Sequence, residues 1–256
     1  MGKLLAFIYG IIAYTLFLVS FVYAIGFVGN VVVPKSIDSG TVGPMIMSLV
    51  VDAALLMLFA VQHSGMARRG FKRWLTRWVP RPIERSTYVL IASSVLLLLY
   101  ALWRPAPNPV WRVSSPAGAT VLWGLFAFGW LVVFLSTFMI GHFDLFGLKQ
   151  VWLNLQGRMQ PPDKFRAPAF YRIVRHPIMV GFLIAFWATP YMSVGHLLFS
   201  IATTGYILIA VQLEERDLLA MLGEEYRRYK LHVPRFIPFP RRVSTSRAVG
   251  ETVATK

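Results

Sequence analysis

Long apolar segments separated by short basic ones are the feature that most constrains this chain. Four such segments stand in the first 140 residues, at about Leu4–Val33, Pro44–Gln62, Thr87–Trp103 and Ala117–Ile140. Each is close to or above the ~20 residues that a helix needs to cross the hydrocarbon core of a bilayer. Only 14% of the residues are charged, against about 25% in soluble domains. The pattern predicts an all-α, polytopic integral membrane helical bundle.

A further apolar segment, from Ile178 to Val211, is interrupted at Pro190. Proline removes a backbone donor and breaks a helix, and irregular backbone at membrane depth has to be shielded by protein or water. We therefore expect a helical hairpin with both ends on one side of the membrane. With the four full spans it makes five or six spans, depending on how the hairpin is counted. An amphipathic helix along the membrane surface is expected over Glu214–Lys230.

The distribution of basic residues predicts the orientation. All but four of the 26 Lys and Arg residues (Lys3, Lys35, Arg104 and Arg112) lie in residues 64–86, in 141–177 or beyond 212. Basic loops face the cytoplasm, so both chain termini are expected there. The formal charge of +15 then reflects topology and attraction to anionic membrane lipid. Nucleic acid is not an expected partner, because the sequence has no recognised nucleic-acid module.

Few ionisable side chains lie in the apolar segments, where each one costs free energy to insert. Asp52 lies within the second segment and His63 at its inner end, while His142 and Asp144 leave the fourth segment together. Each has a functional interpretation and a structural one, namely a hydrogen bond between helices or an ordinary turn. The five histidines stand on separate elements without metal-ligand spacing, and there is no cysteine. We therefore expect no metal site and no thiolate catalysis.

Charged groups stand at both mouths of the predicted hairpin. Pro177 suits the first turn of a helix, so Arg175 and His176 would lie at a helix N-terminus, where free backbone N–H groups favour a carboxylate. Glu214 and Glu215 stand at the other mouth. This acidic pair would either hold ribose hydroxyls or an ammonium group, or pair with nearby Arg residues.

Tyr226 and Tyr229 follow three residues apart, on one face of a helix, as site residues or as anchors at the membrane interface. The full order is Arg175-His176-Pro177-x-x-x-Gly181, the apolar hairpin, Glu214-Glu215, Gly223-x-x-Tyr226-x-x-Tyr229 and Val233-Pro234-Arg235-x-x-Pro238. Over about residues 140–240 this order resembles the isoprenylcysteine carboxyl methyltransferase superfamily.

That resemblance implies that the region binds S-adenosylmethionine in a cytoplasmic pocket over the hairpin. The matching positions are Arg175, His176, Gly181, Glu214, Glu215, Tyr226, Tyr229 and Arg235. One position departs from the superfamily, which commonly has Tyr where this chain has Met179. The departure would remove a polar cofactor contact and weighs against activity on prenylated proteins.

The front half carries its own motifs. They are Tyr23-Ala-Ile-Gly-Phe-Val-Gly29, Val33-Pro-Lys-Ser-Ile-Asp38, Gln62-His63-Ser64 with Met66-Ala67-Arg68, and Pro82-Ile-Glu-Arg-Ser-Thr87. These look like membrane methanethiol S-methyltransferases, bacterial proteins that make dimethyl sulfide from methanethiol. The resemblance implies direct in-line methyl transfer from S-adenosylmethionine to a small volatile thiol at the bacterial inner membrane.

On this interpretation residues 1–141 form the four-span bundle on the substrate side, with Tyr23, Gln62 and His63 as substrate-binding candidates. Residues 142–240 hold the cofactor through a linker, the hairpin and the surface helix, and residues 241–256 are a disordered tail. The resemblance does not single out a proton acceptor. The candidates are Asp52, His63, His142, Asp144 and Glu215.

Two other functions stay open at this point. One is a methyltransferase acting on a larger lipid or isoprenoid thiol or carboxylate. The other is a non-enzymatic membrane protein linked to nitrogen-oxide reduction, because a related group of such proteins shares part of the front pattern. The expected partners are a small thiol and membrane lipid, and the sequence does not indicate an oligomeric state.

Overall fold

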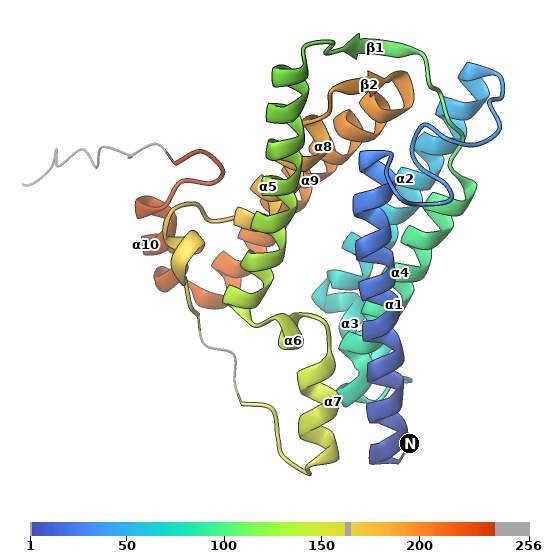
Figure 1. Cartoon of the computed structure of the whole chain (residues 1–256). Helices are drawn as coiled ribbons and strands as arrows, with labels where there is room; N and C mark the ends of the chain where they lie inside the picture. Colours follow the sequence, from blue (N-terminus) through green and yellow to red (C-terminus); the bar gives the residue numbers. More distant parts are fainter. Residues whose placement is uncertain (1, 162–164, 239–256) are drawn as a thin grey trace, which may run out of the picture.

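The computed structural model of this chain describes residues 2–161 and 165–238 (Figure 1). Five helices in these residues are long and apolar enough to cross a membrane: α1 (Lys3–Gly29), α2 (Met45–Ala67), α4 (Arg81–Leu102), α5 (Pro116–Ile140) and α9 (Val194–Leu222). The shorter elements are α3 (Arg69–Leu75), β1 (Pro109–Arg112), α6 (His142–Leu145), α7 (Leu148–Leu155), the 3-10 helix η1 (Ala169–Arg172), α8 (Pro177–Trp187), β2 (Tyr191–Ser193) and α10 (Glu224–His232). The prediction of an all-α, multi-pass membrane bundle is confirmed.

Local sequence explains where the helices begin and end. Pro82, Pro116 and Pro177 occupy the first turns of α4, α5 and α8, where a missing backbone N–H costs nothing. Gly141 ends α5 with φ +100°, a conformation that a residue with a side chain adopts only under strain. The first predicted span was too long, because α1 stops at Gly29 rather than Val33.

The helices pack as two groups that meet through α2 and α9. In the first, α1 packs against α4 and α7, and α2 packs against α4. In the second, α5 packs along α8, and α8 against α9. A two-stranded antiparallel sheet of β1 and β2 closes one end of the bundle, here called the sheet end, and α3, α7 and α10 lie toward the opposite end (Figure 1).

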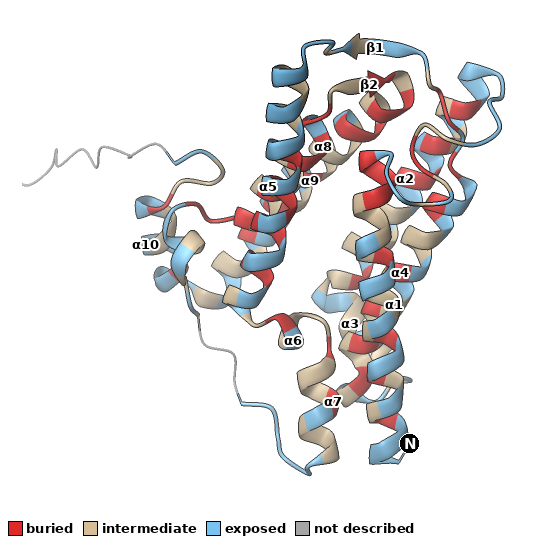
Figure 2. Cartoon of the chain, viewed as in Figure 1, coloured by how far each residue is buried: buried red, intermediate tan, exposed pale blue. Residues whose placement is uncertain are grey.

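The main hydrophobic core includes Phe27, Trp103, Trp130 and Phe199. Large apolar side chains remain exposed on the long helices, among them Leu5, Ile46 and Leu131. Exposed positions are seen along α1 and α5 (Figure 2). Water would not tolerate so extensive an apolar surface, whereas the hydrocarbon of a bilayer would. The exposed faces therefore belong against lipid.

The α8–α9 hairpin is asymmetric. Helix α8 has 11 residues, which at 1.5 Å per residue reach about 16 Å, so it enters the membrane without crossing it. The turn at Pro190 is built into the sheet, and His196 behind it is fully buried, with Nε2 3.0 Å from the Phe186 carbonyl oxygen. His196 is therefore structural.

The predicted surface helix over Glu214–Lys230 was wrong in its boundaries. Helix α9 continues through the acidic pair to Leu222, and the chain turns at Gly223, which has φ +56°, before α10 begins. The acidic pair therefore extends the second arm of the hairpin. The linker before the hairpin also contains α6, α7 and η1 rather than loop alone, and residues 162–164 and the predicted tail at 241–256 lie outside the described residues.

Candidate active site

The two mouths of the hairpin meet at Glu215. Arg175 Nη2 lies 2.9 Å from Glu215 Oε1, and His176 Nε2 lies 3.1 Å from the same oxygen. The three side chains are 2%, 7% and 3% exposed for Arg175, His176 and Glu215. Residues 40 positions apart in the chain thus form one buried ion-pair network. Isolated buried charges are strongly unfavourable, so this mutual pairing is what lets all three side chains leave water.

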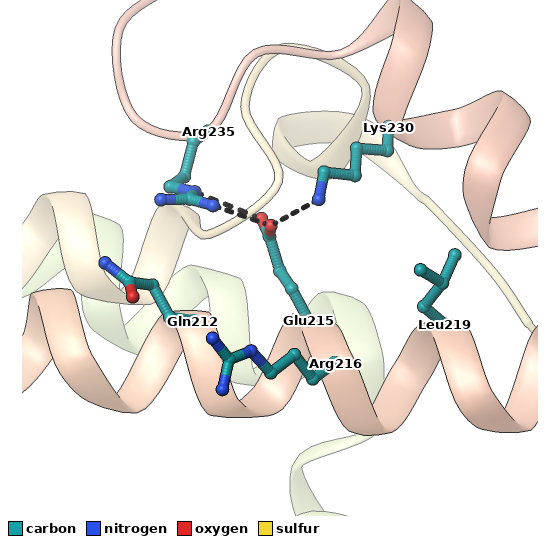
Figure 3. Close-up of a pocket in the computed structure, with 6 residues that line it drawn as sticks. All are labelled: Gln212, Glu215, Arg216, Leu219, Lys230 and Arg235. Carbon is teal, nitrogen blue, oxygen red and sulfur yellow. Dashed lines mark hydrogen bonds and ion pairs between the residues drawn. The ribbon is translucent and has the colours of Figure 1, made fainter.

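The segment around α10 completes this network. Arg235 Nη2 lies 2.8 Å and Lys230 Nζ 3.4 Å from Glu215 Oε2 (Figure 3). Arg175 also donates from Nη1 to the carbonyl oxygens of Lys230 at 2.8 Å and Val233 at 2.9 Å. We call Arg175, His176, Glu215, Lys230 and Arg235 the ionic cluster. It ties the start of α8 to α9 and to the segment after α10.

The ionic cluster carries an excess of positive charge. One carboxylate faces three permanent cations, and burial lowers the pKa of His176 despite its hydrogen bond to Glu215. An open pocket of about 340 Å³ adjoins the cluster (Figure 3), lined by Gln212, Glu215, Arg216, Leu219, Lys230 and Arg235. The arrangement suits an anionic group placed beside Arg235 and Lys230.

The two acidic residues have different surroundings. Glu215 pairs with Arg residues, as its structural interpretation held, although Arg175 and Arg235 are the partners rather than its neighbour Arg216. The Glu214 side chain is 51% exposed, and its Oε2 lies 3.7 Å from Nδ1 of the His176 imidazole. Glu214 therefore keeps a carboxylate available to a ligand, while Glu215 is committed to the protein.

The predicted tyrosine pair also lies beside the cluster. Tyr229 Oη donates to the Tyr171 carbonyl oxygen at 2.6 Å, and burial raises the pKa of Tyr229 to about 12. Tyr226 is 1% exposed, and its hydroxyl has no hydrogen-bond partner among the described residues. Burial, with Glu215 nearby, raises the pKa of Tyr226 as well, so it stays a neutral donor. An unpartnered buried hydroxyl is costly and indicates a site that a ligand can complete.

Gly181, in contrast, has a packing role. A Cβ on Gly181 would lie 2.6 Å from the Gly129 carbonyl oxygen, and one on Gly129 would lie 2.7 Å from the Ala185 backbone nitrogen. The two glycines let α5 and α8 approach closely, as small residues do in membrane bundles. The motif spacing to Pro177 is not needed to explain Gly181, because the close contact between α5 and α8 alone requires glycine there. Met179 lies half-buried in the first turn of α8.

A second polar group joins α2, α4 and α9. Tyr88 Oη lies 3.1 and 3.0 Å from Nδ1 and Nε2 of His63. Ser64 Oγ and Tyr206 Oη are 3.1 Å apart. We call His63, Ser64, Tyr88 and Tyr206 the α2–α9 polar group. One turn further along, Arg68 Nη1 pairs with Asp217 Oδ2 at 2.9 Å.

Two front-half candidates belong to the sheet end instead. The carboxylate of Asp52 is fully buried and accepts a hydrogen bond from the Arg104 backbone N–H at 2.9 Å, which holds the chain after α4. Tyr23 donates to the Lys35 carbonyl oxygen at 2.9 Å and stacks on Tyr100. The structure therefore places Tyr23 at the sheet end, apart from His63. Gln62 donates from Nε2 to Met66 Sδ on its own helix.

His142 and Asp144 are engaged by neighbours. His142 Nε2 lies 2.8 Å from Tyr14 Oη and its Nδ1 lies 2.8 Å from Thr137 Oγ1, with burial lowering the His142 pKa. Asp144 accepts from Lys149 Nζ at 2.6 Å and from Gln150 Nε2 at 2.8 Å. Both side chains fix the turn after α5, as their structural interpretation predicts. No cluster of three or more potential metal ligands occurs in the described part of the chain.

Comparison with known proteins decides the family. A protein of Mycobacterium tuberculosis named methanethiol S-methyltransferase is 57% identical to this chain over 242 residues, covering 94% of this chain and 99% of the relative. A methanethiol S-methyltransferase of Crocosphaera subtropica is 49% identical over 91% of each chain. The chain belongs to the methanethiol S-methyltransferase family. It is therefore a methyltransferase, and the predicted resemblance is confirmed.

The methanethiol S-methyltransferase family has wider relations. The NnrU protein family matches residues 52–213 of this chain. Nurim of Bos taurus is 31% identical over 198 residues, which cover 74% of each chain. No solved structure matches.

Three side chains at the candidate site of this methanethiol S-methyltransferase family member were not predicted from the sequence. Lys230 resembled one more basic residue of a surface helix. Tyr88 follows the motif that ends at Thr87 by one residue, and Tyr206 lies inside the apolar hairpin. The polar hydroxyl of Tyr206 inside an apolar segment could have marked it as a candidate. Tyr88 can be recognised only from the packing of α2 against α4, which brings it to His63.

Proposed function

We propose that this protein transfers a methyl group from S-adenosylmethionine to methanethiol, forming dimethyl sulfide at the bacterial inner membrane. The observation that carries the proposal is the ionic cluster. A cation-rich network beside an open pocket at the base of a membrane hairpin suits the carboxylate of this charged nucleoside cofactor. The names of relatives that match nearly the whole chain support methanethiol as the acceptor.

The residues present fit this cofactor. Arg235 and Lys230 offer positive charge toward the pocket, where the carboxylate of the methionine portion would find partners. Glu214 has a half-exposed carboxylate suited to the ammonium group or to ribose hydroxyls. The unpartnered Tyr226 hydroxyl adds a donor. Arg175 and Glu215 are buried and mutually paired, so they would hold the site in shape.

The chemistry that bound S-adenosylmethionine supplies is an electrophilic methyl group on a sulfonium. The protein has to hold the two reactants in line and exclude water, which lowers the barrier through proximity and orientation. A direct displacement requires no covalent enzyme intermediate and thus no cysteine nucleophile. The cysteine-free sequence is compatible with such a reaction.

The membrane location suits the acceptor. A small apolar thiol partitions into hydrocarbon, so a site among membrane helices receives it at raised concentration. We place the ends of α2 and α9 that carry Arg68 and Glu215 on the cytoplasmic side, because most basic residues lie there. The cofactor would then arrive from the cytoplasm and the thiol from the bilayer.

The test uses full-length protein purified in detergent. Calorimetric titration with S-adenosylhomocysteine is expected to show binding at tens of micromolar or tighter, and incubation with S-adenosylmethionine and methanethiol to release dimethyl sulfide measured by gas chromatography. A farnesyl-cysteine analogue serves as the alternative acceptor. Methylation of that analogue without dimethyl sulfide would replace the proposed acceptor by a lipid, and absence of binding would remove the cofactor.

A matched pair of variants tests the pocket itself. Arg235→Gln removes a cation that lines the pocket, whereas Arg227→Gln removes a cation that is 66% exposed on α10. Charge-assisted hydrogen bonds contribute about 1.5–3 kcal/mol, so Arg235→Gln is expected to weaken S-adenosylhomocysteine binding by roughly tenfold or more. Arg227→Gln is expected to leave it unchanged. Equal affinities for the two variants would place the cofactor elsewhere.

A further inference from the structure

Four of the five proton-acceptor candidates are fixed by contacts within the protein, although Asp52, fully buried at the sheet end, keeps its Oδ2 without a partner among the described residues. Glu215 is shared by the ionic cluster, Asp52 fixes the Arg104 backbone, and Asp144 pairs with Lys149. Both ring nitrogens of His142 have separate hydroxyl partners. A group that accepts a substrate proton needs a lone pair within reach of the substrate. The remaining candidate is His63.

A single hydroxyl, that of Tyr88, lies within hydrogen-bond distance of both ring nitrogens of His63. The Tyr88 hydroxyl is 3.0–3.1 Å from the two ring nitrogens and 3.3 Å from the His63 carbonyl oxygen. The Tyr88 hydroxyl has one hydrogen to donate. If it donates that hydrogen to the carbonyl, its oxygen accepts the imidazole N–H, and the second ring nitrogen keeps its lone pair. Phe59 stacks on the imidazole with ring centroids 5.1 Å apart, which fixes the plane of the ring.

The surroundings of His63 suit a thiol. Phe59 and the aromatic ring of Tyr206 border the imidazole, and these apolar faces accept a small sulfur compound. Positive charge is close as well, because the Arg85 guanidinium lies 5.5 Å from the centre of the Tyr88 ring. Arg68 on α2 and Glu214 on α9 are the other charged groups that interact with Tyr88. A nearby cation favours a thiolate over a thiol.

His63 also lies on the membrane side of the cofactor region. Its neighbour Tyr206 precedes Glu214 by eight residues on α9, which corresponds to about 12 Å along the helix. Glu214 in turn approaches His176 of the ionic cluster. The α2–α9 polar group and the ionic cluster thus occupy successive levels along one helix. A thiol arriving from the bilayer would meet His63 before it reached the charged level.

We propose that His63 is the catalytic proton acceptor for the thiol, and that Tyr88 is its positioning residue. The proposal rests on the function proposed above. The thiol S–H bond breaks as its proton moves to the free imidazole nitrogen of His63, and the sulfur forms a bond to the methyl carbon. The bond from that carbon to the donor's sulfonium breaks, and its electron pair stays on the donor sulfur. The imidazolium then releases the proton to water.

The experiment uses the full-length protein and two small thiols that differ in acidity, methanethiol and the larger 2,2,2-trifluoroethanethiol, and compares variant with wild type for each thiol separately. His63→Gln is expected to lower kcat with methanethiol by about 100-fold or more, and with the more readily ionised fluorinated thiol by less than about fivefold. Affinity for S-adenosylhomocysteine, measured by calorimetry, is expected to stay within about twofold. His232→Gln is the matched control, since His232 is an exposed histidine of α10.

Tyr88→Phe tests the positioning role. It is expected to lower kcat with methanethiol by about tenfold and to move the pH dependence of kcat/KM, because the imidazole N–H loses its acceptor. It also keeps the proposal testable if His63→Gln does not fold. A merely structural role would reduce activity equally with both thiols and leave the pH profile in place, and that result would overturn the proposal. If wild-type protein binds no S-adenosylhomocysteine, the proposed function fails instead.

Discussion

The most informative single substitution is Glu215→Gln, which removes the central charge of the ionic cluster while keeping the side-chain size. Arg175 and His176 are 2% and 7% exposed, so Arg175 would remain as a buried charge without a counterion. Breaking a buried ion pair costs about 3–5 kcal/mol. Arg175 keeps its hydrogen bonds to the carbonyl oxygens of Lys230 and Val233, which favours the lower limit.

The more exposed ion-pair partners of Glu215 contribute little to the free energy of unfolding. Arg235 and Lys230 are 34% and 41% exposed, and each such pair contributes about 1 kcal/mol or less. We therefore expect Glu215→Gln to lower the free energy of unfolding by about 3 kcal/mol. For a chain of this size that corresponds to a Tm roughly 6–12 °C lower.

Thermal unfolding in detergent, followed by tryptophan fluorescence, measures this effect. Glu224→Gln is the matched control, because Glu224 is 61% exposed and lies 3.6 and 3.9 Å from Arg227 and Arg228. It is expected to change Tm by less than about 1 °C. If both variants unfold at the wild-type temperature, the cluster does not hold α8, α9 and α10 together, and the reasoning from burial is refuted.

Three further predictions follow from individual contacts. Tyr226→Phe is expected to raise Tm slightly, since it removes a costly buried hydroxyl that has no partner among the described residues, but to weaken S-adenosylhomocysteine binding about fivefold in calorimetry; a lower Tm with unchanged affinity would contradict this. Gly181→Val is expected to lower Tm by several degrees, because its Cβ meets the Gly129 carbonyl oxygen at 2.6 Å, and a wild-type Tm would show that α5 and α8 separate freely. Burial lowers the folded-state pKa of His176, so below about pH 6.5 the unfolded chain binds a proton that the folded protein resists. Stability should therefore decrease as the pH is lowered below about 6.5. The Tm of His176→Gln should depend less steeply on pH than the Tm of the wild type, and equal slopes for the two proteins would exclude His176 as the cause.

Several parts of the fold and site were predictable because they depend on local sequence. Pro177 predicts where α8 starts, and the break at Pro190 predicts the hairpin; α4, in contrast, starts at Arg81, before the predicted start of the third span at Thr87. The closeness of Arg175 and His176 to the acidic pair followed from placing both at the hairpin mouths, whereas their direct pairing with Glu215 became visible only in the structure. The end of α9 was less predictable, because only the conformation of Gly223 decides whether the helix stops before or after the acidic pair.

The sequence by itself determined that the chain is a membrane bundle of helices and which family it belongs to. Both depend on properties that accumulate along the chain, namely apolar length, basic loops and motif order. Only the tertiary structure decided how the ionisable residues divide, with Asp52 and Asp144 committed to structure and His63 left with the single hydroxyl of Tyr88 beside its two ring nitrogens. The physical reason is that a polar side chain's role depends on which of its lone pairs and hydrogens already have partners, and those partners come from helices far away in the sequence.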